Sequence, residues 1–393
     1  MKANTLNDCN IEAKKVLVRT DYNVPMDSEG NITDDKRIRD SLPTFKYLLE
    51  NNVSKIIILT HLGRPKEKEE ILKTDKPAEK LSELLRAEVK KIDDWGENGL
   101  PDSKIVMLEN SRFNPAEKSK DEKERDAFAE QICKNADQFV MEAFSNMHRE
   151  KEASMTSTLK FLPGCLGFAA EKEVETIEDA LENPQRPFVS IIGGAKADKL
   201  SSVENIMKKA DTVLLGGVLA FSVLHERGFY MGSTKIDYDN LSNYSHVLEN
   251  LKENVILPED AVIADEFSES ANAQQALVGE IKEGWMALDL GPATLQKYKE
   301  YIKNAKTIIW NGPIGVFEFD KFANGTREII QAIAESNANS IIGGGDSAAA
   351  VKKLGFEGMA GFISSGGGAS LKMFEGKSLP VLDELEKNRE KFS

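Results

Sequence analysis

Short apolar runs rich in β-branched residues recur along the whole chain and alternate with longer amphipathic stretches. This alternation limits the fold more than any other feature, because strands that alternate with helices form parallel sheets covered by those helices. The expected strands are Lys15–Arg19, Lys55–Thr60, Lys104–Leu108, Gln138–Met141, Phe188–Ile192, Thr212–Leu215, Ala287–Leu290, Thr307–Trp310, Ser340–Ile342 and Gly361–Ile363. The expected helices include Asp121–Asn135, Ser201–Lys209, Pro292–Lys303 and Asn324–Glu335. We therefore predict an α/β protein with mainly parallel sheets.

The chain is too long for one ordinary core. Its 393 residues exceed the length at which a single hydrophobic core stops growing. The stretch EKEVETIEDALENPQRP, residues 171–187, is typical of an exposed helix that ends at a proline-flanked break. We predict a first domain over residues 1–167, a linker helix over 168–186 and a second domain over 187–378.

Charge and apolar content exclude several classes of protein. The formal net charge of −14 argues against general nucleic-acid binding, which needs a basic face. The first residues, MKANTLNDCNIEAKKVLV, contain no apolar signal segment, and no apolar run approaches the roughly 18 residues of a membrane helix. Cys9, Cys133 and Cys165 are too widely spaced for a disulfide framework or a cysteine zinc site. We expect a cytoplasmic enzyme without nucleic-acid or membrane partners.

The loops that follow the expected strands change character midway along the chain. In the first half they carry arginine and histidine, as in TDYNVP, THLGRP, ENSRFNP and SNMHRE. In the second half they carry glycine, as in GGAK, GGVLA, NGPIG, GGGDS and SSGGGAS. Ligands of open α/β sheets bind beyond the carboxyl ends of the strands. The sequence therefore predicts two sites, one cationic and one lined by glycine.

The glycine loops are typical of phosphate binding. Glycine lets a ligand approach the backbone, and a helix that begins directly after the loop points free N–H groups at an anion. The loop IIGGAKADKL nevertheless lacks the Walker spacing, because one residue separates Gly194 from Lys196 and Ala197 stands where Ser or Thr would. Lys196 is the expected phosphate ligand. Lys199 lies on nearly the same helix face and either reaches a phosphate as well or turns to solvent.

Two acids of the second half have more than one interpretation. Asp346, in GGGDS, suits a ligand of Mg²⁺ on nucleotide phosphates and equally a helix N-cap. Glu318 suits ribose hydroxyls or a solvated loop. GGGDSA also matches a loose dinucleotide fingerprint, which makes a nicotinamide oxidoreductase the alternative function. The acid expected about 20 residues further on is missing, which weakens that alternative.

Cationic residues of the first half gather in or beside the strand-end loops. They are Arg37, His61, Arg64, Arg112 and Arg149. Arginine binds carboxylate and phosphate oxygens in pairs, and Asp21 and Asn23 of TDYNVP could fix a hydroxyl and a carboxylate. One domain would then bind a small, highly anionic molecule and the other a nucleotide. Phosphoryl transfer is the chemistry that joins them, and no G-x-S-x-G, H-E-x-x-H or C-x-x-C motif competes with it.

The chain resembles the phosphoglycerate kinase family over residues 18–380. The matching stretches occur in the family's order: VRTDYNVP, DDKRIRDSLPTFKYLL, THLGRP, LENSRFNPAE, EAFSNMHRE, IIGGAKADKL, LDLGPAT, IIWNGPIGVFE, IIGGGDSAAAV and ISSGGGASLKMFEGKSLP. The resemblance implies two Rossmann-like domains joined by a hinge helix, with the tail 379–393 packing back on the first domain. It implies a monomer without a prosthetic group.

The resemblance also implies an activity and a site. The reaction would be Mg²⁺-dependent, reversible, direct in-line transfer between 1,3-bisphosphoglycerate and ADP, giving 3-phosphoglycerate and ATP on domain closure. Phosphoglycerate would be held by Asp21, Asn23, Arg37, His61, Arg64, Arg112 and Arg149. The nucleotide would be held by Gly193, Gly194, Lys196, Gly217, Gly291, Asn311, Glu318, Gly344, Gly345, Asp346 and Ser347, with Asp346 on the metal. Arg37, Lys196 and Lys199 would be catalytic, and Gly366, Gly367 and Gly368 would form an anion-stabilising loop.

Several positions depart from the family pattern. MEAFSNMHR stands where N-D-A-F-G-T-A-H-R is usual, so Glu142 is longer than the usual acid and a glycine is lost. GGVLA has one glycine fewer than G-G-G-M-A, Ser347 replaces a threonine, and the loop after GGAK is one residue shorter. These departures leave a second alternative open, a binding or regulatory protein that kept the fold without catalysis.

Overall fold

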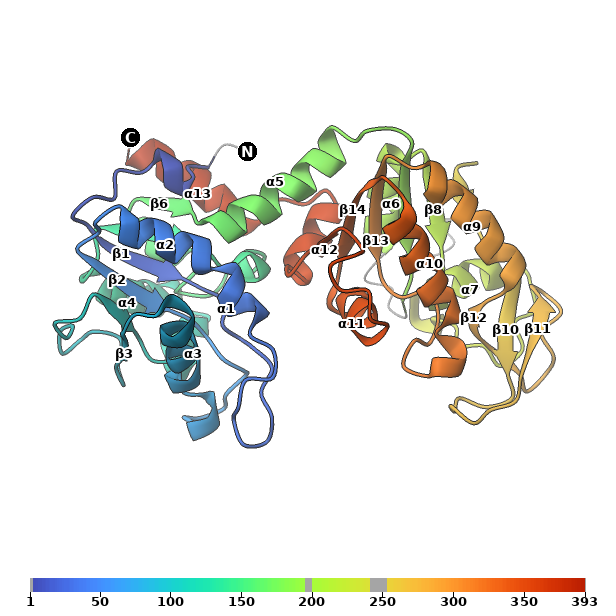
Figure 1. The fold of residues 1–393 in the computed structure, drawn as a ribbon, viewed down its shortest axis with the longest axis horizontal. Helices are drawn as coiled ribbons and strands as arrows, with labels where there is room; N and C mark the ends of the chain where they lie inside the picture. The colour runs from blue at the N-terminus through green and yellow to red at the C-terminus, as the bar shows by residue number, and fades with distance from the viewer. Residues whose placement is uncertain (1–2, 195–199, 241–252, 393) are drawn as a thin grey trace. The chain divides into compact units, whose positions relative to one another are not determined.

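The structure is a computed structural model that describes residues 3–194, 200–240 and 253–392 (Figure 1). It divides into two compact units, Met1–Thr176 with Ser378–Ser393, and Ile177–Lys377. The division falls inside helix α5, Phe168–Glu182, which overlaps the predicted linker helix 168–186. Lys196 and Lys199 lie outside the described residues.

The first unit is built on a six-stranded, fully parallel sheet with the strand order β3-β4-β2-β1-β5-β6. The strands are β1 Lys15–Arg19, β2 Lys55–Leu59, β3 Val89–Lys91, β4 Ile105–Met107, β5 Gln138–Met141 and β6 Gly164–Leu166. Its helices are α1 Lys36–Asp40, α2 Leu42–Glu50, α3 Asp75–Leu85, α4 Glu122–Cys133 and α13 Pro380–Lys391. Because β1 and β2 are central strands covered on both faces, Val16–Val18 and Ile56–Leu59 are almost completely buried.

The second unit contains a second six-stranded parallel sheet, ordered β15-β14-β13-β7-β8-β9. Its strands are β7 Phe188–Ile192, β8 Thr212–Leu215, β9 Val255–Ile256, β13 Thr307–Asn311, β14 Asn339–Gly343 and β15 Phe362–Ile363. Its helices include α6 Leu200–Lys209, α7 Gly217–Glu226, α9 Pro292–Asn304, α10 Asn324–Glu335, α11 Gly345–Lys353 and α12 Gly368–Phe374. The prediction of an α/β fold with mainly parallel sheets is confirmed.

A third, smaller sheet belongs to the second unit. Strands β10 Asp260–Ala264, β11 Ala273–Leu277 and β12 Met286–Leu290 form an antiparallel sheet with β10 in the middle. The predicted strand Ala287–Leu290 therefore exists, but it pairs in this sheet and not in the parallel one. Short 3-10 helices lie at η1 Leu6–Asp8, η2 Glu70–Leu72, η3 Ser111–Phe113, η4 Pro115–Lys118, η5 Phe144–Asn146, η6 Ser157–Lys160, η8 Tyr238–Asn240 and η9 Asp320–Phe322.

The C-terminal helix α13 is fastened to the first unit by one buried side chain. Asn388 accepts a hydrogen bond from the Gly164 amide of β6 (2.7 Å). Its amide nitrogen donates to the carbonyls of Leu159 (2.6 Å) and Leu162 (2.8 Å). Asn388 is 3% exposed, so these bonds are shielded from water and hold residues more than 220 positions apart in sequence.

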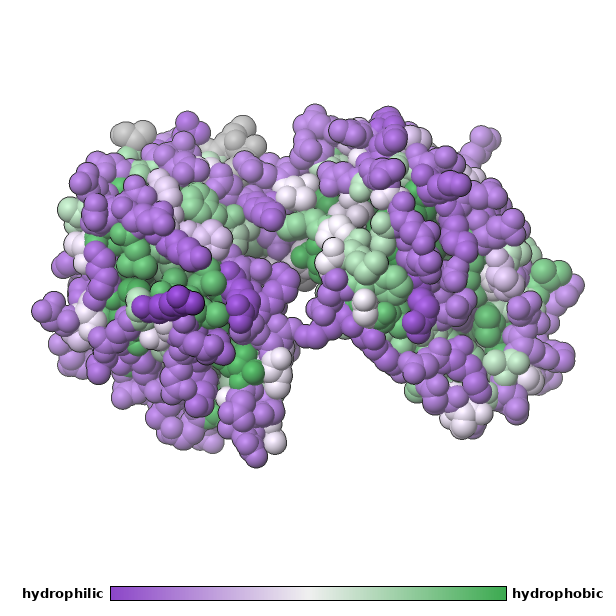
Figure 2. Space-filling view, viewed as in Figure 1, coloured by the Kyte–Doolittle hydropathy of each residue, from purple (hydrophilic) through white to green (hydrophobic). Residues whose placement is uncertain are grey.

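Charged and polar residues cover most of the face of each unit that is seen in Figure 2. Of the helices in the described part of the chain, none is both long enough and apolar enough to cross a membrane.

Candidate active site

Cationic side chains converge at the carboxyl edge of the parallel sheet in the first unit. Arg19 ends β1, His61 follows β2, Arg112 lies in η3 after β4, and Arg149 follows β5. Because parallel strands all end at one edge of their sheet, these loops meet there. Lys118, at the end of η4, joins the same group.

One carboxylate lies among these cations. Oε1 of Glu152 is 3.0 Å from Nη2 of Arg112, 3.2 Å from Nη1 of Arg149 and 3.6 Å from Nζ of Lys118. Burial alone would raise the pKa of Glu152, but the cations, Arg112 first, bring that pKa below its ordinary value. Nε of Arg112 and Nε of Arg149 are buried and have no hydrogen-bond partner among the described residues. The side chains of Arg149 and Lys118 are partly exposed, so the cluster keeps positive groups that an anion can reach.

His61 is neutral in this surrounding. It is 1% exposed, and burial lowers its pKa well below the ordinary value, with Arg19, Arg112, Arg149 and Lys118 lowering that pKa further. Nδ1 of His61 lies 3.3 Å from Nη2 of Arg19. Because a guanidinium can only donate, Nδ1 accepts this bond and the ring proton sits on Nε2. His61 is thus a neutral hydrogen-bond donor within a cationic site.

Arg37 is held by the loop TDYNVP. Its Nη1 donates to Oδ2 of Asp21 (2.7 Å) and to the carbonyl of Asn23 (3.0 Å). Oδ2 of Asp21 also accepts a hydrogen bond from Oγ of Ser145. The side chain of Arg37 remains 33% exposed, so part of the guanidinium faces solvent.

Gly63 joins the Arg37 group to the cation cluster. Its amide donates to Oδ1 of Asn23 (2.8 Å), and its carbonyl accepts from Nη1 of Arg112 (2.6 Å). The structure therefore brings together six of the seven predicted residues: Asp21, Asn23, Arg37, His61, Arg112 and Arg149. Arg64, next to Gly63, is exposed and has no ion pair with any residue in the described ranges.

In the second unit, three glycine loops pack backbone against backbone at the carboxyl edge of the sheet. The amide of Gly193 donates to the carbonyl of Asn311 (3.0 Å), and the amide of Gly194 donates to that of Pro313 (2.8 Å). A Cβ on Gly193 would lie 2.3 Å from the Pro313 oxygen. Gly217 has φ +60°, and a Cβ there would lie 2.8 Å from the Gly194 nitrogen. Side chains are therefore excluded at positions 193 and 217 of this edge.

Helix α11 begins at the same edge. Gly344, its N-cap, has φ +89° and provides no side-chain cap, so the first N–H groups beyond it are not capped by a side chain. Oγ of Ser347 is fully buried and accepts from the Gly312 amide (2.7 Å), which ties α11 to the NGPIG loop. Asp346 is exposed in the first turn, and no described residue pairs with its carboxylate.

The SSGGGAS loop leads into α12. Gly367, the N-cap, has φ +48°, and the amide of Gly366 donates to Oγ of Ser364 (3.1 Å). Gly368 is the first residue of the helix and is exposed. The loop and the first turn of α12 are held by the bond between Oγ of Ser364 and Oγ of Ser370 (2.6 Å).

Gly291 and Glu318 have less specific surroundings. Gly291 precedes α9, and a Cβ there would lie 2.2 Å from Cγ of Asp260. The Asp260 carboxylate already accepts from the first amides of α9, those of Ala293 (3.0 Å) and Thr294 (2.8 Å). A glycine is therefore required at 291 by packing alone. Glu318 is exposed, and its carbonyl accepts from Nζ of Lys353 (2.5 Å).

The unusual acid Glu142 lies at the start of α5. It is 6% exposed, and Oε1 accepts from Oγ1 of Thr44 (2.9 Å) and from the Ala169 amide (3.3 Å). Oγ1 of Thr44 in turn accepts from the Phe168 amide (2.9 Å). Burial raises the pKa of Glu142 to about 8. The longer acid thus satisfies amides at the N-terminus of α5.

Sequence reasoning missed four residues of these sites: Arg19, Lys118, Glu152 and Asp289. Arg19 closes an apolar run, and a charge in that position was the one available signal. Asp289 is 1% exposed and accepts from the amides of Gly325 (2.6 Å) and Leu290 (2.9 Å). A Cβ on Gly315 would lie 2.1 Å from its Oδ1, so Asp289 lies directly behind the NGPIG loop. Burial raises the pKa of Asp289 to about 7.

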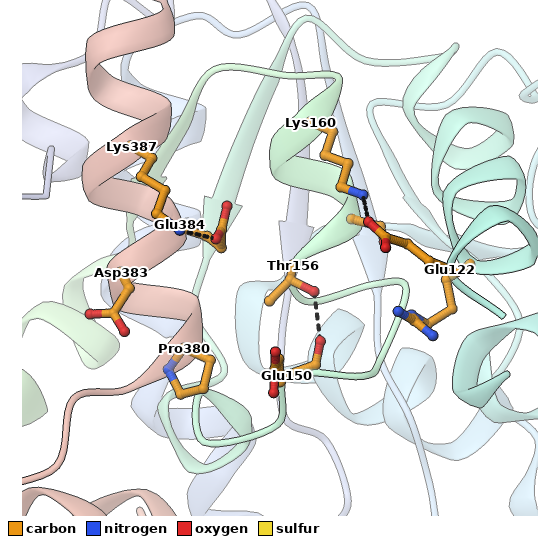
Figure 3. A pocket seen from close by; sticks show the side chains of 10 residues that line it. Glu122, Glu150, Thr156, Lys160, Pro380, Asp383, Glu384 and Lys387 are labelled. Carbon is orange, nitrogen blue, oxygen red and sulfur yellow. Dashed lines mark hydrogen bonds and ion pairs between the residues drawn. The ribbon is translucent and has the colours of Figure 1, made fainter. Parts of the chain in front are cut away.

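A polar hollow beside α13 has a different character (Figure 3). It is lined by four carboxylates and three cations, and Figure 3 shows Lys160 facing Glu122 and Lys387 facing Glu384. These pairs are 2.5 and 2.6 Å long. Because its lysines are already paired and acids are in excess, the hollow is a poor anion site. None of the predicted site residues lines it.

The residues fit a magnesium ion that is held mainly by a nucleotide. In the described ranges, no three His, Cys, Asp or Glu side chains gather as a metal cage. Asp346 offers one exposed carboxylate beside the uncapped start of α11. Mg²⁺ commonly takes one or two protein carboxylates and completes its shell with phosphate oxygens and water.

Comparisons with known proteins show the family to which the chain belongs. Residues 6–377 match the family model described as phosphoglycerate kinase. The chain is 42% identical to the phosphoglycerate kinase of Moorella thermoacetica over 388 residues, covering 96% of this chain and 97% of the relative. It is 43% identical to that of Dictyoglomus turgidum over 393 residues, covering 97% and 98%.

Solved structures give the same result. The structure of phosphoglycerate kinase from Coxiella burnetii superposes with a TM-score of 0.89 at 35% identity, covering 98% of this chain and 99% of that one. The enzyme from Pyrococcus horikoshii superposes with a TM-score of 0.85 at 33% identity, covering 99% and 100%. The family match spans nearly the whole chain and both units, and we conclude that the chain belongs to the phosphoglycerate kinase family.

Proposed function

We propose that this protein transfers a phosphoryl group reversibly between 1,3-bisphosphoglycerate and ADP, giving 3-phosphoglycerate and ATP, as a step of glycolysis. The observation that carries the proposal is the presence of a partly buried cation cluster in one unit and a glycine-lined edge in the other. The first suits a small, highly charged anion, and the second suits a nucleotide. Membership of the family supports the same reaction.

The phosphoglycerate occupies the first unit in this proposal. Arg112 and Arg149 offer positive charge to a phosphate or carboxylate group, and the side chain of Arg149 is 32% exposed. His61 donates from Nε2 to an oxygen without adding charge, and the exposed Arg64 would add a further cation that holds the substrate. Asp21 and Asn23 orient the substrate and hold Arg37 by the bonds to its Nη1.

The nucleotide occupies the glycine edge of the second unit. Gly193, Gly194 and Gly217 would line this site. A Cβ at 193 or 217 would meet backbone atoms, so no side chain projects from those two positions. The amides at the start of α11, from Gly345 to Ser347, face phosphate oxygens. Gly367 and Gly368 supply further amides for the transferred group, and Gly366, whose amide donates to Oγ of Ser364, shapes that loop. The remaining residues that we predict to bind the nucleotide or to shape its site are Asn311, Glu318, Gly291 and Gly344. Asp346 would hold Mg²⁺, which neutralises phosphate charge when it is bound.

Transfer needs alignment and charge neutralisation more than proton chemistry. The acceptor is a carboxylate that is already ionised at neutral pH, so no general base is required. Direct in-line transfer requires donor and acceptor within bonding reach, and we propose that binding of both substrates closes the two units. Arg37 and Lys196 then neutralise the negative charge on the oxygens of the transferred phosphoryl group. Lys199 either contacts a phosphate as well or points to solvent.

Further properties follow as parts of the same proposal. We propose a cytoplasmic monomer without nucleic-acid or membrane partners and without a prosthetic group. No observation favours the nicotinamide oxidoreductase that GGGDSA alone suggested, and the match to phosphoglycerate kinases spans that loop. A binding protein without catalysis is distinguished from the enzyme by turnover.

A coupled assay tests the proposal. Purified protein should consume ATP in the presence of 3-phosphoglycerate and Mg²⁺, with oxidation of NADH by added glyceraldehyde-3-phosphate dehydrogenase as the readout. Turnover should require all three components. Folded protein that binds ADP calorimetrically but does not turn over would instead favour the non-catalytic binding protein.

A further inference from the structure

The cation cluster contains a lysine that no motif pointed to. Lys118 reaches Oε1 of Glu152 at 3.6 Å, the same oxygen that Arg112 and Arg149 contact at 3.0 and 3.2 Å. At 3.6 Å the ion pair is too long for a good hydrogen bond, so the three donors of the ammonium group remain available. Lys118 therefore contributes positive charge to the cluster, and its ammonium group can still donate hydrogen bonds to a ligand.

Exposure shows which groups face solvent. The side chains of Glu152 and Arg112 are each 4% exposed, whereas those of Arg149 and Lys118 are 32% and 44% exposed. The carboxylate thus lies on the protein side of the cluster. Arg149 and Lys118 extend past it toward solvent, where a ligand would arrive.

The position of Lys118 is fixed by its neighbours in the chain. The carbonyl of Glu117 accepts from the Ala153 amide (2.8 Å). The Glu117 carboxylate, fully buried, accepts from the amide (3.0 Å) and hydroxyl (2.5 Å) of Ser154. These bonds join residue 117 to residues 153 and 154, and they set Lys118 beside Glu152 as a consequence.

We propose that Lys118 is a further cation of the phosphoglycerate site and that Glu152 is the positioning residue that holds it beside Arg112 and Arg149. The inference rests on the proposed function and extends it. A phosphate monoester carries close to two negative charges on three oxygens, which suits three cations on one side. Like charges so close would repel one another, and the shared carboxylate offsets that repulsion while leaving the cluster positive.

Lysine variants test the binding half of the proposal. Lys118→Gln should raise KM for 3-phosphoglycerate about tenfold, the loss typical of one partly exposed charged contact. It should leave kcat within about twofold and KM for ATP unchanged, whereas Lys118→Arg should keep most of the affinity. Lys120→Gln is the matched control, because Lys120 is exposed, two residues away and without an ion pair in the described part of the chain.

Glutamate variants test the positioning half. Glu152→Gln should also raise KM for 3-phosphoglycerate about tenfold with little change in kcat, and Glu152→Asp should restore part of the loss. In the double variant with Lys118→Gln, the two effects should be less than additive, since both act through one contact. Glu150→Gln, at an exposed acid two residues away, should behave as wild type. Thermal unfolding shows whether Glu152→Gln is folded, and the Lys118 variants decide the proposal if it is not.

The possible results separate the two levels of the argument. An active wild type whose KM is unchanged in Lys118→Gln would overturn the inference and leave the proposed function intact. A lower KM in Glu152→Gln would show that the carboxylate only weakens anion binding, and the positioning role would be wrong. A folded wild type without turnover would remove the proposed function and this inference with it.

Discussion

Replacing Glu142 by Gln should change how the stability of the protein depends on pH. The carboxyl is buried at the start of α5, where Thr44 and the Ala169 amide bond one oxygen. The other oxygen has no hydrogen-bond partner among the described residues. A glutamine keeps the shape and the accepting oxygen but cannot ionise.

The sign and size of the effect follow from the raised pKa. Burial moves the pKa of Glu142 from 4.5 to about 8 in the folded state. Between about pH 4.5 and pH 8 the folded protein therefore binds more protons than the unfolded chain. The stabilisation from the protonated carboxyl is complete below about pH 4.5 and is lost as pH rises to about 8. One pKa unit corresponds to about 1.4 kcal/mol, so the free energy of unfolding of the wild type should fall by at most ~5 kcal/mol across this pH range. That of Glu142→Gln should not show this fall.

Urea unfolding from about pH 5 to pH 8.5 measures this difference. The stability of Glu142→Gln relative to wild type should rise steadily across the window. An amide hydrogen that finds no acceptor adds a constant penalty of about 1–3 kcal/mol, so the slope carries the test and the offset does not. Glu150→Gln, at an exposed acid, should show no slope. A flat difference between Glu142→Gln and wild type would refute the reasoning.

Three further predictions each concern the replacement of a single residue. Arg37→Ala should lower kcat about a hundredfold or more because a charge-neutralising donor is lost, whereas Arg39→Ala, whose arginine pairs with Asp35 on the surface, should not; an effect on KM alone would contradict the catalytic role. Gly217→Ala should raise KM for ATP and cost about 1–3 kcal/mol more than Gly228→Ala in thermal unfolding, because both have positive φ but only position 217 meets backbone atoms. Asn388→Ala should destabilise the first unit by about 3 kcal/mol, through three lost buried hydrogen bonds; stability equal to that of the exposed Lys387→Ala would show that α13 is not held by this residue.

Most of the parallel strands could be predicted because their sequences are continuous apolar runs rich in β-branched residues. The bounds of β1, β5, β7 and β8 match the prediction to the residue. Most of the missed strands lack that pattern, although β10, DAVIA, has an apolar run and was missed as well. β11, AQQAL, alternates between exposed and half-buried residues, and β3, VKK, has a single apolar residue. Their pairing comes from neighbouring strands, which a local pattern cannot reveal.

The candidate site was predictable where a ligand group directly follows a strand. His61 comes two residues after β2, and Gly193 directly follows β7. Glu152 and Lys118 were missed because they lie far from any strand end. They are brought together by the bonds of Glu117 to Ala153 and Ser154, which no local pattern reveals. Gly291 shows that a match to a ligand pattern can have a purely structural cause. A glycine is required there because a Cβ would collide with the Asp260 carboxylate.

The most direct measurement is chemical trapping of the acyl phosphate. Hydroxylamine converts an acyl phosphate to a hydroxamate, so protein incubated with 3-phosphoglycerate, ATP, Mg²⁺ and hydroxylamine should accumulate hydroxamate and ADP in equal amounts. Omission of any substrate should abolish both products. ADP release that does not depend on 3-phosphoglycerate, or no product from folded protein, would contradict phosphoryl transfer between the two sites.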